Sequence, residues 1–184
     1  MNSISFCYPG FYSKKVLFKG CPAQIMSENV LEYKNYQNVG GIYIFPKGSR
    51  SVYTDLDTPI FTTDLLQYIA LIIIDKNKQK HYMAHININT PSSKIASDLR
   101  KNFGNNYEDW KNLEIFLVKG EEKETQATVN NVLNSLRLIN DNIPGKVIII
   151  DNPEWDYFTV SDKGSIYKSD KPLNDLPYEP TVIR

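Results

Sequence analysis

The chain has 184 residues, with 21 basic and 21 acidic side chains and a formal net charge of zero. This length predicts one domain whose core needs neither disulfides nor metal, and the zero net charge excludes the long-range field that steers nucleic acid or an anionic membrane. Two cysteines are too few for a disulfide framework or a four-ligand zinc site, and no stretch has the apolar length of a signal-peptide core or a membrane span.

Residues 1–40 are the least informative part of the chain. Prolines and glycines divide them around one strand-like piece at residues 15–19 (KVLFK). Residues 23–39 could mark a short helix but fit its period poorly. We therefore assign no further structure to this segment.

The pattern sharpens after Gly40. Residues 41–45 (GIYIF) and 51–54 (SVYT) predict strands around a turn at residues 46–48. Residues 68–74 (YIALIII) are continuously apolar and β-branched, which predicts a strand buried on both faces. Residues 82–88 alternate apolar and polar side chains, so this strand has one apolar and one polar face.

The connection between these two strands decides which side chains meet. A two-residue turn at residues 76–77 would place Tyr68 opposite His85, whereas a five-residue loop at residues 76–80 would place His85 opposite Leu71. Lysine and asparagine make a poorer turn pair than asparagine and glycine. The local sequence leaves both registers open.

The second half alternates helices and strands. A charged turn, EEKE, follows Gly120, and the tail from Lys171 is irregular because of its three prolines. The order of elements predicts an α+β domain with two helices on one face of a mostly antiparallel sheet. The predicted elements are a helix at residues 92–103 capped by Ser92 or Ser93, a strand at 113–118, a helix at 125–140, a strand at 146–151, and a hairpin of 157–160 with 165–167.

Asp75 and the run Met83-Ala84-His85 resemble the chemoreceptor glutamine deamidase family (CheD), in which a strand ending in Asp leads into a strand that carries Met-Ala-His. Counting back from Asp75, the family's Thr-Leu-Gly-Leu-Gly-Ser-Cys segment falls on residues 62–68. The resemblance implies a bacterial protein with an α/β/β sandwich. It divides the single domain, residues 1–184, into an N-terminal extension at 1–40, a family-like core at 41–168 and an irregular tail at 169–184.

The resemblance implies a degenerate catalytic triad. Thr62 matches the active-site threonine and His85 the catalytic histidine, while Tyr68 takes the place of the nucleophilic cysteine. A phenol has a pKa of about 10 and is a poor substitute for a thiol. Asp64 and Leu66 replace both glycines of the loop that donates N–H groups to an oxyanion. We therefore expect a protein-binding or regulatory module without deamidase activity and without cofactor or metal.

Two alternatives to a binding module stay open. Cys21 could act with His85 as the nucleophile of a glutamine deamidase or related hydrolase. The protein could also be an effector exported without a cleaved signal, although the composition predicts a cytoplasmic location. His81 and His85 lie four residues apart on one strand face, but without a third ligand we expect hydrogen-bonded or solvated histidines rather than a metal site.

Overall fold

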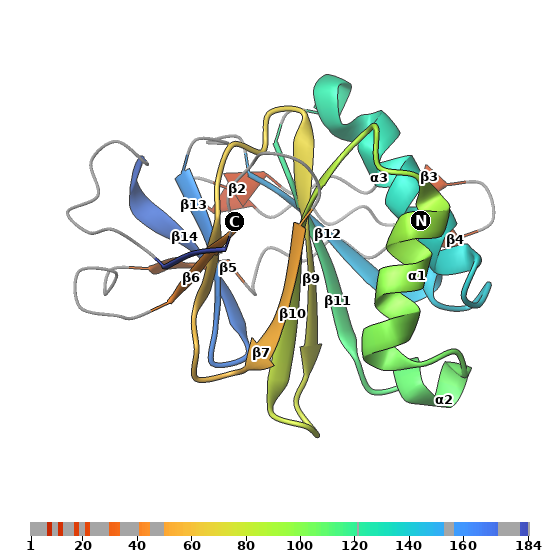
Figure 1. Ribbon diagram of the computed structural model, residues 1–184. Coiled ribbons are helices and arrows are strands. Elements are labelled where there is room, and N and C mark those ends of the chain that lie inside the picture. The colour runs from red at the N-terminus through yellow and green to blue at the C-terminus, as the bar shows by residue number, and fades with distance from the viewer. Residues whose placement is uncertain are drawn as a thin grey trace.

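The computed structural model forms three layers: helices, a central sheet and a second sheet, an α/β/β sandwich of the α+β class (Figure 1). The predicted fold class is confirmed. No helix among the described residues is long and apolar enough to cross a membrane. The structure describes residues 41–44, 50–120, 122–152 and 157–172, and the backbone of the strand pieces 7–8, 11–12, 17–18, 21–22, 30–33 and 181–183.

The central sheet is built around one strand that is buried on both faces, as its continuous apolar sequence predicts. In this strand, β9, Leu71 faces the helices and Ile72 faces the second sheet, and neither is exposed to solvent. The sheet order is β12-β11-β9-β10-β7, and β11 pairs with β12 in parallel. The bounds are β7 Arg50–Asp55, β9 Tyr68–Asp75, β10 Lys80–Asn87, β11 Glu114–Lys119 and β12 Val147–Asp151.

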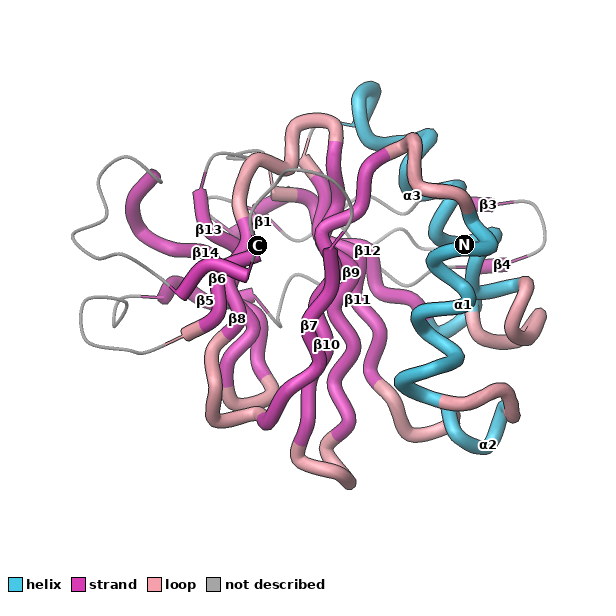
Figure 2. Tube along the Cα trace, viewed as in Figure 1, coloured by secondary structure: helices cyan, strands magenta, loops and turns pink. Residues whose placement is uncertain are grey.

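The second sheet covers the other face of the central sheet (Figure 2). Its order is β15-β6-β8-β13-β14-β5. Lys163 and Gly164 connect β13 and β14, the two strands of the predicted hairpin. Their φ values of 48° and 76° are both positive, as a type I′ turn requires. The bounds are β5 Val30–Tyr33, β6 Ile42–Ile44, β8 Ile60–Thr62, β13 Tyr157–Asp162, β14 Ser165–Pro172 and β15 Thr181–Ile183.

The helices pack on the face of the central sheet opposite the second sheet, as predicted (Figure 1). The helix α1 (Ser92–Phe103) buries Ile95, Leu99 and Phe103, which recur every four residues. The helix α3 (Glu122–Arg137) connects the parallel strands β11 and β12. Four further strands form two short hairpins: β1 (Cys7–Tyr8) with β2 (Phe11–Tyr12), and β3 (Leu17–Phe18) with β4 (Cys21–Pro22).

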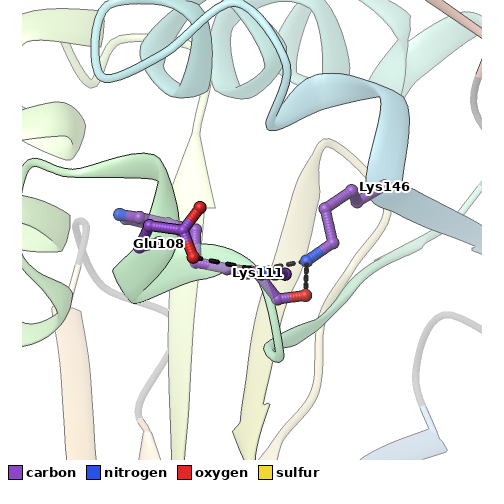
Figure 3. A network of polar contacts seen from close by, with 4 residues as sticks. Glu108, Lys111 and Lys146 are labelled. Atoms are coloured by element: carbon purple, nitrogen blue, oxygen red, sulfur yellow. Dashed lines mark hydrogen bonds and ion pairs between the residues drawn. The ribbon is translucent and has the colours of Figure 1, made fainter.

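Lys146 anchors the short helix α2 (Tyr107–Trp110) to η1 (Pro144–Lys146), the 3₁₀ turn before β12. Its ammonium donates to the backbone carbonyls of Trp110 and Lys111, at 2.5 and 2.6 Å (Figure 3). Carbonyls at a helix C-terminus lack intrahelical partners, and a cation is stabilising there. Figure 3 also shows Lys111 reaching back to Glu108 on the helix. Burial lowers the pKa of Lys146.

Neither predicted register of the focal hairpin is correct. Lys80 pairs with Asp75, so residues 76–79 form the turn and His85 lies opposite Ala70. Two local contacts favour the four-residue turn, because Asp75 Oδ1 accepts a hydrogen bond from the Lys78 N–H at 3.0 Å and Gln79 takes a φ of 53°. The observed register differs from the two-residue prediction by two positions. A shift by an even number of residues keeps each side chain on the same face of the sheet. Tyr68 and His85 therefore still lie on a common face.

Three smaller predictions are also corrected. The charged segment after Gly120 is not a turn throughout, since α3 begins at Glu122. Neither serine caps α1, whose N-cap is Pro91 without a side-chain hydrogen bond. The tail is not wholly irregular, because β14 extends to Pro172 and β15 pairs in parallel with β6. The predicted turn at residues 46–48 lies outside the described residues.

Gly104 ends α1 with a φ of 86° and a ψ of −178°, a backbone region that essentially only glycine adopts. A Cβ there would lie 2.4 Å from Asp109 Oδ2. We expect Gly104→Ala to lower the free energy of unfolding in urea by about 1–3 kcal/mol. Gly145→Ala is the matched control, since an added Cβ meets no atom within 4 Å. Equal effects of the two substitutions would contradict this expectation.

Candidate functional site

The three residues that the family resemblance singles out come together between the two sheets. Thr62 ends β8 in the second sheet, Tyr68 begins β9, and His85 lies on β10. The Thr62 hydroxyl lies 2.9 Å from His85 Nδ1, and the centroids of the Tyr68 and His85 rings are 4.7 Å apart. The site therefore depends on the packing of one sheet against the other.

Thr62 determines which nitrogen of His85 carries the proton. Its Oγ1 also lies 3.2 Å from the carbonyl oxygen of Ile44, to which it donates. A hydroxyl has one proton, so Oγ1 accepts from Nδ1–H when it donates to that carbonyl. This arrangement satisfies both contacts and leaves the lone pair of the ring on Nε2.

His85 is fully buried, and burial lowers the pKa of its ring from 6.5 to about 4. The ring is therefore neutral at neutral pH. Its Nε2 has no hydrogen-bond partner among the described residues. A neutral imidazole with a free lone pair is the form that a general base requires.

Tyr68 lies beside the His85 ring. Its ring is half-buried and lies against the His85 ring with an interplanar angle of 38°. The position is diagonal across the hairpin, since Asn87 is the direct partner of Tyr68 and Ala70 that of His85. The Tyr68 ring therefore occupies the space beside His85.

The loop between β8 and β9 keeps one backbone feature that usually requires glycine. Asp64 has a φ of 60°, and this left-handed region is easily adopted by glycine and tolerated by aspartate. Asp64 is one of the two positions where the resemblance places a glycine. Leu65 is fully buried beside it, which fixes the loop to the core.

His81 belongs to a separate and fully bonded environment. Its Nδ1 lies 2.7 Å from Ser161 Oγ on β13, and its Nε2 lies 2.8 Å from the carbonyl oxygen of Thr58. Burial lowers the pKa of His81, and the ring joins the two sheets. No group of three histidine, cysteine, aspartate or glutamate residues that could hold a metal occurs in the part of the chain that the structure describes.

The side chain of Cys21, the alternative nucleophile, lies outside the described residues. Its backbone belongs to β4, which contacts η1, and η1 in turn contacts α3. Figure 1 shows β4 beside α3, on the helix side of the central sheet. His85 lies on the opposite face.

Sequence reasoning found Thr62 but missed two other buried polar residues of the second sheet, Thr159 and Lys168. Thr159 on β13 is the direct partner of Thr62 on β8 and of Lys168 on β14. The Thr159 hydroxyl has no hydrogen-bond partner among the described residues. The alternation of Thr159, Val160 and Ser161 was the available signal, because it places two hydroxyls on one strand face.

Neither the family models nor the curated proteins searched with this chain give a match. The resemblance to the glutamine deamidases therefore rests on the motif residues themselves.

Proposed function

We propose that this chain is a deamidase-fold protein of the CheD type that lacks glutamine deamidase activity and acts as a protein-binding or regulatory module. The α/β/β layers supply the scaffold expected of that family. The contact of Thr62 with His85, across the two sheets, has the arrangement expected of a histidine held by its orienting residue.

The contact between Tyr68 and His85 carries this proposal. Deamidation through a covalent intermediate needs a thiolate beside the histidine, with room for a carboxamide. The position holds instead a phenol ring, at 4.7 Å between centroids. A phenol is a much weaker nucleophile than a thiolate, and the Tyr68 ring would take up the space of a substrate carboxamide.

A protein is the partner that this site favours. The substrate of the family is a glutamine side chain on a protein surface, so the rim of the site is suited to contact another protein. Tyr68 is half-buried at that rim, and tyrosine is enriched among the residues that dominate binding energy in protein interfaces.

The test is ammonia release from a glutamine-rich protein, with casein as the probe. We expect no release above background from the wild-type protein, because Tyr68 stands where the nucleophile would lie beside His85, and none from His85→Ala. Release that His85→Ala abolishes would overturn the proposal.

Cys21→Ser is the control for the alternative enzyme. Activity lost in both Cys21→Ser and His85→Ala would assign the nucleophile to Cys21. The placement of β4 against η1, on the other face of the central sheet from His85, argues against that outcome.

A further inference from the structure

A pocket of about 210 Å³ lies between α1 and the edge of the central sheet. Its apolar floor is formed by Ala84 and Ile86 of β10 and by Ile95 of α1. These two β10 residues face the helices, whereas His85 between them faces the second sheet. The pocket is therefore a different site from the one around His85.

One wall of the pocket is a hydrogen-bonded polar group. Asp98 Oδ2 accepts from Ser51 Oγ at 2.8 Å and from Tyr82 Oη at 2.7 Å. Burial and the Asp98 charge raise the pKa of Tyr82 well above its usual value, so its hydroxyl stays protonated as a donor. Both hydroxyls are held in place by Asp98, and the negative charge of Asp98 is satisfied within the protein.

Thr90 and two cationic residues complete the lining of the pocket. Lys94 of α1 and Arg50 of β7 line the pocket, and the Lys94 ammonium forms no ion pair with any described residue. The first turn of α1 contains no acidic side chain and no side-chain cap, so the positive end of the helix dipole adds to the same field. The Lys94 ammonium and the positive end of the helix dipole, beside one internally bonded carboxylate, favour an anion.

We propose that this pocket binds a small organic carboxylate with a short apolar body. The carboxylate lies at the Lys94 rim, and the apolar body packs on Ala84, Ile86 and Ile95. The volume is below the roughly 300–1,000 Å³ of pockets for drug-sized ligands, which limits the ligand to the size of a small metabolite.

The experiment is a titration of the full-length protein, followed by amide chemical shifts, with three probes. Isovalerate has the proposed carboxylate and body, isoamylamine has nearly the same body with a cation, and inorganic phosphate has the charge without the body. We expect saturable shifts at the pocket residues for isovalerate in the millimolar range, and none for isoamylamine. Phosphate is expected to bind at least tenfold more weakly than isovalerate, because it gains nothing from the apolar floor.

Lys94→Gln is expected to weaken isovalerate binding by about tenfold, because one charge-assisted contact is lost. Lys101→Gln is the matched control: Lys101 is an exposed lysine on the same helix outside the pocket. Both lysines are exposed, so both variants are expected to fold. Absence of isovalerate binding, equal binding of isoamylamine, or equal losses in the two variants would overturn the proposal.

Discussion

Replacing Lys119 with methionine is expected to lower the free energy of unfolding by about 3–5 kcal/mol. Lys119 Nζ lies 2.6 Å from Asp151 Oδ1, and the two side chains are 3% and 15% exposed. The residues are direct partners on the parallel strands β11 and β12. Methionine has a similar volume but no charge, so the substitution removes the cation beside the largely buried Asp151 carboxylate.

Urea denaturation followed by circular dichroism measures this loss. Lys111→Met is the matched control, because Lys111 pairs with Glu108 at 3.5 Å with both side chains largely exposed. Exposed ion pairs contribute about 0–1 kcal/mol. The double variant Lys119→Met/Asp151→Leu removes both charges and is expected to recover part of the loss. A loss at Lys119 no greater than that at Lys111 would contradict the expectation.

The central hairpin was largely predictable because its two strands carry strong and different patterns. β9 is apolar and largely β-branched from Ile69 to Ile74, which favours a strand covered on both faces over a buried helix. β10 alternates, and Tyr82, Ala84 and Ile86 do face the helices. The opposite face carries His81 and His85 and is nonetheless buried, because a second sheet covers it.

That second sheet was the least predictable part of the fold. β8 has only three residues, Ile60–Thr62, and β15 comes from a tail that its prolines marked as irregular. Such short strands carry too few residues to show a period. They form because the strands beside them offer unpaired backbone groups, a property of the assembled sheet rather than of the local sequence.

The candidate site was predictable only in part, because it combines contacts within one hairpin with contacts between distant segments. The adjacency of Tyr68 and His85 follows from parity within one hairpin, so it survived an error of two positions in register. Other contacts join segments that lie far apart in the chain. Ser161 contacts His81, and Ser51 lines the same pocket as Lys94 and Asp98. Long-range contacts of this kind leave no periodic signal.

The burial of His85 is expected to make the protein less stable as the pH falls from 7.5 to 5. The folded state holds the ring neutral with a pKa of about 4, whereas the unfolded chain protonates near 6.5. Between these values the unfolded state binds more protons, so stability rises with pH. The His85 contribution is fully present above pH 6.5 and is lost as the pH falls toward 4. At pH 5 the loss amounts to about 2 kcal/mol.

Urea denaturation at a series of pH values, compared between the wild-type protein and His85→Asn, isolates this contribution. Between pH 7.5 and 5, the free energy of unfolding of the variant is expected to fall by about 2 kcal/mol less than that of the wild type. His81→Asn is the matched control, because its ring is also buried with a lowered pKa but lies outside the Thr62 contact. His81→Asn should remove only the contribution of His81 to the pH dependence of the free energy of unfolding. The contribution of His85 should remain. If His85→Asn keeps the full pH dependence of the wild type, His85 is not a buried neutral ring between the sheets. That result would also contradict the proposal that His85 is the remnant of a catalytic base.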